Sequence, residues 1–189
     1  MGRSLEGNRE KSEGGEMKND QYFLNICYLI AEGSKCLSRK VGACLVKDNV
    51  IISTGRNGPP RGIMHCDERC INDDRLAAEL MSRGLDPIEA SKSDICPRRL
   101  LGYKSGEGLE WCPAAHGERN VLIHAARFGI STKEAIMYMN CGIPCKDCLI
   151  EIINAGVIEL VCIDKNHYYD NMSEFLVEES NLIVREYEL

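Results

Sequence analysis

The hydrophobic and polar positions of this chain follow two periods, one typical of helices and one typical of strands. Residues 21–34 (QYFLNICYLIAEGS) carry apolar side chains at helical spacing and predict an amphipathic helix. Residues 41–55 predict two strands that turn at Asp48 and Asn49, residue types that favour a hairpin. Residues 56–62 (RNGPPRG) contain two prolines and two glycines and predict an irregular loop.

Helical and strand patterns alternate in the second half of the chain. We expect helices at 117–129, 145–156 and 172–180, and strands at 134–140, 157–164 and 182–187. Gly129 and Gly156 are suited to ending the first two helices. Strands that alternate with helices imply an α/β layered fold, here with an antiparallel hairpin at the start of the sheet.

Two segments depart from this pattern. Residues 1–19 are polar, lack the apolar core of a secretory signal and predict a disordered tail, which leaves 20–189 as a single domain. Between about 62 and 112 the periodicity weakens, and only 73–85 predicts a short helix. We interpret 62–112 as a cysteine-rich insertion; its cysteines are Cys66, Cys70, Cys96 and Cys112.

Charge and cysteine content narrow the function. The formal net charge is −6, which favours a small substrate over a nucleic-acid polymer, because polymer binding usually relies on a basic face. No apolar run approaches the roughly 18 residues that a membrane span needs. The 11 cysteines are an odd number without a secretion signal, so we expect thiols and metal ligands in a cytoplasmic protein.

A Cys-x-x-Cys pair opens the predicted helix at 145–156. Cys145 and Cys148 are three residues apart, so one helical turn presents both sulfurs on one side. The dipole of a helix N-terminus favours the thiolate form, and Pro144 suits a helix start. Two such thiolates form half of a zinc site, although a redox pair or two core cysteines would share this spacing.

His116 and Glu118 open the predicted helix at 117–129. With Cys145 and Cys148, His116 makes three protein ligands, which leaves a fourth tetrahedral position for water and is typical of catalytic zinc. The metal lowers the pKa of that water, and Glu118 can move its proton without binding the metal. A surface histidine beside a helix-capping glutamate is the alternative interpretation of the pair taken alone.

The two halves together form a recognised motif. H-x-E followed by P-C-x-x-C is the signature of zinc-dependent nucleobase deaminases. Here residues 119–143 separate the halves, which is room for one helix and one strand. Over 21–165 the chain resembles the deoxycytidylate (dCMP) deaminases of the cytidine deaminase superfamily. The segments that carry this likeness are SKCLSRKVGACLVKDNVIISTGRNGPPRGIMHC, CPRR, SGEGLEWC and HGERNVLIHAARFGIS.

The resemblance implies a fold, an activity and a set of site residues. It implies a three-layer α/β/α cytidine deaminase-like fold with a mixed central sheet, and the hydrolysis of dCMP to dUMP and ammonia, which feeds thymidylate synthesis. Carried over by position, zinc would bind His116, Cys145 and Cys148, and Glu118 would shuttle protons. The N–H of Gly117 would contact the pyrimidine carbonyl, and Asn57 would bind the deoxyribose hydroxyl.

The resemblance also implies partners and metals beyond this site. Such proteins are usually homo-oligomers, hexamers or dimers, and many are activated by dCTP and inhibited by dTTP. A preference for the 5′-monophosphate would need an arginine; the candidates are Arg56, Arg61, Arg119 and Arg127. We further predict a second, structural zinc from the cysteine excess. Its candidate ligands are Cys66, Cys70, Cys96 and Cys112, with Cys36 as a further candidate.

Three departures from the family pattern bear on the substrate. Gly117 replaces the alanine of H-A-E, which predicts extra room beside the base for a larger pyrimidine substituent. Arg56 replaces the tyrosine of G-Y-N-G, and the approach to the cysteine pair, YMNCGIPC, is one residue longer. The alternatives are therefore a deaminase of cytidine, dCTP or 5-substituted dCMP, a polynucleotide deaminase, or a non-catalytic zinc module with a closed site.

Overall fold

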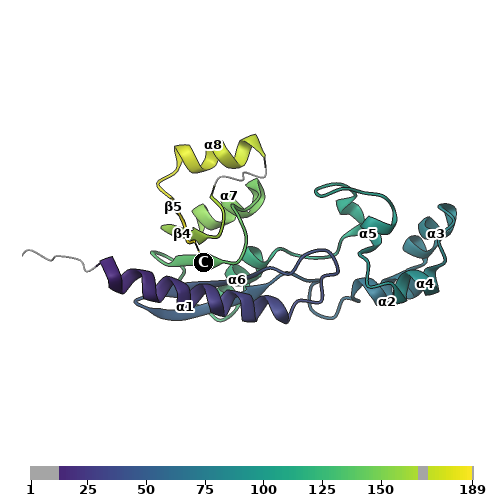
Figure 1. Ribbon diagram of the computed structural model, residues 1–189, viewed down its shortest axis with the longest axis horizontal. Helices are drawn as coiled ribbons and strands as arrows, with labels where there is room; N and C mark the ends of the chain where they lie inside the picture. The colour runs from purple at the N-terminus through teal and green to yellow at the C-terminus, as the bar shows by residue number, and fades with distance from the viewer. Residues whose placement is uncertain (1–12, 166–169, 189) are drawn as a thin grey trace, which may run out of the picture.

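One mixed sheet organises the computed structural model, which describes residues 13–165 and 170–188. Within these residues the sheet has five strands in the order β2-β1-β3-β4-β5 (Figure 1). β1 is antiparallel to β2 and β3, whereas β3, β4 and β5 are parallel to one another. The strands are β1 (Gly42–Lys47), β2 (Val50–Arg56), β3 (Ile136–Met139), β4 (Glu159–Cys162) and β5 (Ile183–Glu186). The predicted hairpin and mixed sheet are confirmed.

The hairpin turn follows from its two central residues. Asp48 and Asn49 both adopt positive φ angles, 51° and 61°. A two-residue loop with positive φ at both positions matches the twist of the strands it joins, and Asp and Asn tolerate this backbone region. β1 and β2 therefore pair directly across the turn, with Lys47 opposite Val50.

Helices cover both faces of the sheet. α1 (Glu13–Glu32) lies on one face, where Phe23 and Leu24 pack with Cys44 of β1. α6 (Gly117–Arg127), α7 (Lys146–Asn154) and α8 (Asn171–Glu179) lie on the other (Figure 1). Alternate residues of β1 serve the two layers, as the period of a strand requires. The predicted three-layer α/β/α architecture is confirmed.

α1 begins inside the segment that we predicted as a disordered tail. The helix starts at Glu13, whereas residues 1–12 lie outside the described part of the chain. Residues 13–20 contain one large apolar side chain, so hydrophobic periodicity gives no signal there. The buried Asp20 carboxylate accepts hydrogen bonds from Tyr138 at 2.7 Å and from Arg185 at 2.6 Å. These hydrogen-bond partners of Asp20 are more than a hundred residues away in the chain, so a local sequence pattern cannot predict them.

The insertion forms a lobe of short helices beside the sheet (Figure 1). These are α2 (Cys66–Asn72), α3 (Asp74–Ser82), α4 (Pro87–Lys92), α5 (Pro97–Leu100) and the 3₁₀ helix η1 (Leu109–Trp111). The lobe has its own apolar cluster around Leu76, Leu80 and Leu101. The predicted helix at 73–85 is present as α3. Asp73 and Asp86 cap α3 and α4, and α4, with six residues, is too short for a periodic pattern to stand out.

The helices of the second half match their predicted ranges to within a few residues. α6, α7 and α8 begin at residues 117, 146 and 171. None of the helices in 13–165 and 170–188 combines the length and the apolar character that a membrane crossing requires.

Candidate active site

Two helix N-termini place the predicted metal ligands. His116 is the N-cap of α6, with φ −70° and ψ 157°, and Cys145 is the N-cap of α7, with φ −65° and ψ 161°. Cys148 lies in the first turn of α7. Extended backbone at an N-cap turns the side chain toward the helix start, where unpaired N–H groups favour negative charge. The two helices therefore present all three side chains at one place.

The three donor atoms lie at distances suited to zinc. The ligand atoms of His116, Cys145 and Cys148 are all within 4.8 Å of one another, the only such group of three or more in the described residues. His116 Nδ1 is 3.6 Å from the Cys145 sulfur and 3.3 Å from the Cys148 sulfur. Tetrahedral zinc, with bonds of about 2.0–2.1 Å to nitrogen and 2.3 Å to sulfur, separates such atoms by about 3.6 Å. The donor set and its geometry fit zinc.

The exposure of the three ligands is uneven. Cys148 is buried, Cys145 is half-buried and His116 is exposed. Within the described residues no fourth histidine, cysteine or carboxylate joins the group. Structural zinc sites are closed by four protein ligands, whereas catalytic sites keep one position open. This arrangement is of the open kind.

The pKa of Cys145 favours the thiolate form, which suits the cysteine pair to binding a cation. Hydrogen bonds from Cys148 and His116 lower the pKa of Cys145 to about 4. The same contact with Cys145, together with burial, raises the pKa of Cys148. One thiolate is therefore present at neutral pH, and the second proton must leave when a metal binds. Metal affinity at such a site depends on pH for this reason.

Glu118 lies beside the metal ligands without joining them. Its side chain is only 5% exposed, in the first turn of α6 and two residues from His116. Burial raises the pKa of this carboxyl, and among the smaller effects the positive charge of Arg39 opposes the rise. A carboxyl with a raised pKa can accept and return a proton near neutral pH.

Gly117 and Asn57 lie close together beside His116, since a Cβ at Gly117 would be 3.5 Å from the backbone nitrogen of Asn57. The N–H of Asn57 donates to Val41 at 3.0 Å, and Gly58 pairs with Ala115 just before His116. A Cβ at Gly117 would lie 3.1 Å from the Val41 carbonyl oxygen and 3.2 Å from a Val41 methyl carbon. The expected extra room beside the base is therefore not open space, because Val41 already occupies it.

The arginines predicted to bind phosphate separate into two groups. Arg119 is engaged by Glu151, and Arg127 lies over the Phe128 ring at 5.8 Å, at the end of α6 remote from His116. In the described residues, no ion pair or side-chain hydrogen bond engages the guanidinium of Arg56 or Arg61. Arg119 is therefore already paired within the protein, and Arg127 lies away from the zinc ligands.

Arg39 is a charged residue near the site that no sequence motif marks. Its positive charge acts on both Glu118 and the buried Cys141 thiol, so its side chain lies near the site. Residues 33–66 carry six Lys and Arg against one Asp, in a chain of net charge −6. This local excess of positive charge could have been found by counting.

The cysteines of the insertion do not form a second group of this kind in the described residues. Cys70 lies in the apolar cluster of the lobe, and its thiol donates to the Cys66 carbonyl at 3.3 Å. Burial raises the pKa of Cys66 to about 12, and the remaining candidates add to the effect; these are Cys96, Cys112 and Cys36. The second zinc remains a prediction, with Cys70 the weakest of its candidate ligands.

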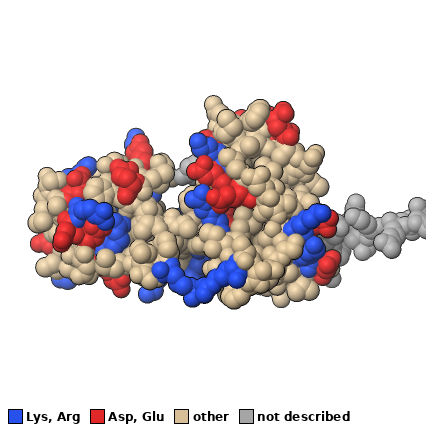
Figure 2. All heavy atoms as spheres, turned by 180° about the vertical axis from the view of Figure 1, so that it is seen from behind, with Lys and Arg blue, Asp and Glu red and all other residues tan. Residues whose placement is uncertain are grey.

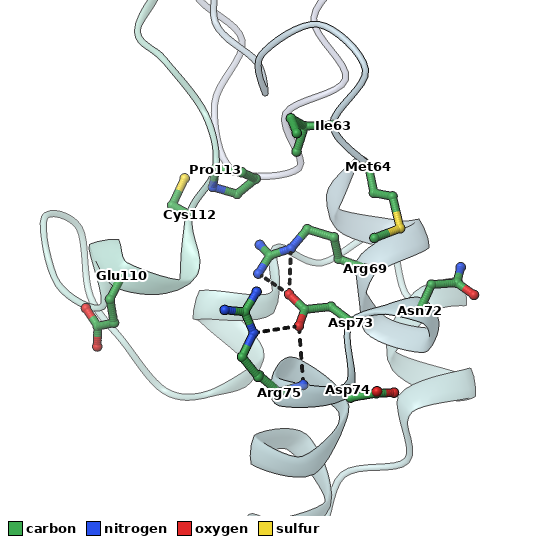
Figure 3. Close-up of a pocket in the computed structure, with 10 residues that line it drawn as sticks. All are labelled: Ile63, Met64, Arg69, Asn72, Asp73, Asp74, Arg75, Glu110, Cys112 and Pro113. Carbon is green, nitrogen blue, oxygen red and sulfur yellow. Dashed lines mark hydrogen bonds and ion pairs between the residues drawn. The ribbon is translucent and has the colours of Figure 1, made fainter.

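A hollow lies beside the site rather than in it. It encloses about 560 Å³ between α2, α3 and the segment that leads to His116. Figure 3 shows Arg69 and Arg75 both bonded to the Asp73 carboxylate on one wall, opposite Cys112 and Pro113. Neither Glu118 nor a metal ligand lines this hollow. Its two arginines are already neutralised in part by Asp73, so it is not a free anion site.

Comparison with known proteins assigns the chain to a family. Residues 17–164 match the family described as the cytidine and deoxycytidylate deaminase zinc-binding region. The chain belongs to this family, and the predicted membership is confirmed. The family's zinc-binding region includes the three ligands described above, so zinc is the expected cofactor of this site.

Two relatives and one solved structure illustrate the similarity. The chain is 36% identical to the deoxycytidylate deaminase of Enterobacteria phage T2, over 73% of this chain and 76% of that protein. It is 29% identical to the deoxycytidylate deaminase of Schizosaccharomyces pombe over 89% of its own length, but spans only 44% of that protein. The crystal structure of dCMP deaminase from cyanophage S-TIM5 in complex with dCMP and dUMP superposes with a TM-score of 0.61 at 19% identity. That match covers 94% of this chain and 100% of the phage chain, and it confirms the fold.

Proposed function

We propose that this protein is a zinc-dependent deaminase that hydrolyses dCMP to dUMP and ammonia. The observation that carries the proposal is the open group of three zinc ligands with the buried Glu118 carboxyl beside it. The family membership and the names of its relatives support the same reaction. A non-catalytic zinc module would need a fourth ligand, and would have no use for a buried carboxyl at an open position.

The chemistry divides between the metal and Glu118. Zinc, when held by His116, Cys145 and Cys148, supplies the Lewis acidity that lets water act as a nucleophile near neutral pH. Glu118 takes a proton from the attacking water and delivers it to N3 of the cytosine ring. It then helps to protonate the exocyclic amino group, the C4–N bond breaks and ammonia leaves. The net reaction consumes one water and replaces the amino group by a carbonyl.

Gly117 and Asn57 are proposed to hold the substrate. Gly117 is the first residue of α6, so its N–H has no partner inside the helix and can donate to the pyrimidine carbonyl. The side-chain oxygen of Asn57 accepts from the Ser34 hydroxyl at 2.8 Å and from the Val41 N–H at 2.9 Å. Its side-chain amide donates to the backbone carbonyl of Arg39 at 2.7 Å. The second amide hydrogen of Asn57 remains for the deoxyribose hydroxyl.

A 5′-phosphate fits the positive charge near Asn57. Figure 2 shows Lys and Arg side chains along the edge where the insertion lobe meets the rest of the molecule. Arg39 precedes β1 and its carbonyl oxygen accepts from Asn57, while Arg56 ends β2 directly before Asn57, and we propose these two as the phosphate-binding candidates. Arg61 lines a separate hollow with His124 and Phe128, toward the other end of α6, and is the weaker candidate. Arginine suits this role because its planar fork of donors matches paired phosphate oxygens.

Substrate profiling tests the proposal. Ammonia release should be measured for deoxycytidine, dCMP, dCTP, 5-methyl-dCMP and single-stranded DNA. We expect kcat/KM for dCMP to exceed that for deoxycytidine at least tenfold. Equal turnover of the nucleoside would contradict dCMP as the substrate, and faster turnover of the DNA would favour the polynucleotide alternative.

Partners and location complete the proposal. We propose a homo-oligomer, a hexamer or a dimer, that responds to dCTP and dTTP and works in the cytoplasm. Apolar side chains on α6 and at its C-cap support self-association, since Ile123 is 54% exposed and Phe128 is 71% exposed. Light scattering of the protein and of Phe128→Glu measures the assembly, and rates at fixed dCMP with added dCTP or dTTP measure the regulation.

A further inference from the structure

An ion pair joins the two helices that carry the zinc ligands. Arg119 of α6 donates from Nε to both carboxylate oxygens of Glu151 of α7, at 2.9 and 3.0 Å. Its Nη2 donates to the same carboxylate at 2.5 Å. Both side chains are 39% exposed. A guanidinium bound through two nitrogens fixes direction as well as distance, unlike a single charge contact.

The position of this pair relates it to the ligands. Arg119 follows His116 by three residues, and Glu151 follows Cys148 by three. Residues three apart share a helix face, so each partner lies about one turn, roughly 5 Å, along its helix from a ligand. The contact with Glu151 raises the pKa of Arg119, and the nearby Cys148 and Asp147 add to this effect. The guanidinium is therefore close to the ligand helix N-terminus.

α6 is hydrogen-bonded to β2 through Ser53, Asn120 and His124, but apart from the ligand group no other hydrogen bond or ion pair among the described residues joins α6 to α7. Val121 and Ala125 of α6 and Leu149 and Ile152 of α7 all lie in the core cluster on the sheet. Apolar burial holds the helices on the sheet but is not directional. A zinc site tolerates little error, because ligand distances are fixed to about 0.2 Å. The Arg119–Glu151 ion pair is directional, so it can fix the distance and orientation of α6 relative to α7, which apolar packing does not.

We propose that Arg119 and Glu151 are positioning residues of the zinc site, whose ion pair sets the placement of α6 relative to α7. It thereby holds His116 at binding distance from Cys145 and Cys148. The inference depends on the zinc site alone, so it stands or falls independently of whether dCMP is the substrate.

Zinc affinity of charge-reversal variants tests this role. The dissociation constant for Zn²⁺ should be measured by competition with a chelator for wild type, Glu151→Arg and the swapped pair Arg119→Glu/Glu151→Arg. We expect Glu151→Arg to weaken zinc binding about 10- to 100-fold, the range for residues that orient metal ligands. The swapped pair should return to within about threefold of wild type, because it restores an attraction between the same positions.

A matched pair elsewhere provides the control. Glu79 of α3 and Arg83, the C-cap of that helix, form a similar surface ion pair at 2.8 Å, away from the zinc ligands. Glu79→Arg makes the same charge reversal and should leave zinc affinity within about twofold of wild type. If Glu151→Arg fails to fold, Glu151→Gln replaces it, with an expected weakening of about 3- to 10-fold.

Two results would overturn the proposal. One is zinc affinity in the Glu151 variant that stays within about twofold of wild type, which would make the pair an ordinary surface contact. The other is a loss of affinity that the swapped pair does not recover, since the effect would then not arise from the pairing.

Discussion

The α6–α7 pair and the insertion lobe both place cysteines at helix starts, yet they differ in what those cysteines meet. Cys145 is the N-cap of α7, while Cys96 is the N-cap of α5 and Cys66 is the first residue of α2. α7 lies beside α6, whose N-cap His116 supplies a third donor atom. In the described residues, α2 and α5 have only seven and four residues, and the lobe brings no such set of donor atoms together.

The difference concerns the support of each helix rather than its local sequence. α6 and α7 rest on the sheet through residues of one continuous core, which brings their N-termini close together, and the Arg119–Glu151 ion pair joins the two helices directly. The helices of the lobe pack around a smaller cluster of their own. A cysteine at a helix start is a good metal ligand in electrostatic terms, but a site requires a second element that delivers donors to the same point.

The largest effect that we expect comes from the site region. Glu118→Gln should lower kcat by at least about 10³-fold, because an amide cannot accept the proton and proton transfer contributes roughly 10²–10⁴-fold per step. Zinc should remain, since Glu118 is not among the ligands. Steady-state kinetics and metal analysis of the same sample measure both quantities. His116→Ala is the comparison variant and should lose zinc as well as activity. Retention of more than about a tenth of the wild-type kcat by Glu118→Gln would remove it from the mechanism.

The next effect concerns Arg39, in the loop that precedes β1. Arg39→Gln should lower kcat/KM for dCMP about 10- to 100-fold, the usual value of a charged hydrogen bond, and should leave deoxycytidine unchanged. Arg127→Gln is a matched control, because Arg127 lies over Phe128 at the other end of α6. Equal losses for nucleotide and nucleoside would show that Arg39 does not recognise the phosphate.

A zinc count compares the cysteines of the two regions directly. If the lobe binds the predicted second zinc, the purified protein carries two zinc ions per chain, and Cys66→Ser or Cys112→Ser lowers the count to one. Cys70→Ser should not change it, because that thiol lies in the apolar cluster. One zinc per chain in the wild type, unaffected by either serine variant, would exclude the second site.

The smallest expected effect is a pH dependence of the lobe. Hydrogen bonds from Arg69, with a further contribution from Arg75, lower the pKa of Asp73 below its ordinary value of 3.8. The stabilisation is therefore fully present above that ordinary pKa and is lost as the pH falls through the lowered value in the folded protein. We expect the contribution to be about 1 kcal/mol, as for a partly exposed ion pair.

Urea unfolding at pH 6 and pH 3 checks this dependence. Wild type should lose more stability on acidification than Asp73→Asn, in which the titrating group is absent. An identical loss in the two proteins would mean that Asp73 does not contribute in this way.

Much of the site could be predicted because its signals are local. H-x-E and P-C-x-x-C each lie within one helix start, and helical geometry places Cys145 and Cys148 on one side. The alternation of helices with strands predicted the layers between them. Apart from α3, the short helices of the lobe were missed, since they are set by caps such as Asp86 and by tertiary packing rather than by periodicity. Arg39 was missed because no motif marks it.

The sequence by itself determined the elements that depend on neighbours along the chain: the hairpin at Asp48 and Asn49, the helices that begin beside His116 and Cys145, and the types of donor for zinc. Only the tertiary structure decided the relations between distant residues. Arg119, a candidate for phosphate binding in the sequence, forms an ion pair with Glu151 instead. Val41 packs against Gly117, and α1 begins as early as Glu13. The physical reason is range, since backbone preferences and helix caps act within a few residues. Ion pairs and close packing depend instead on how a sheet arranges segments that are far apart in the chain.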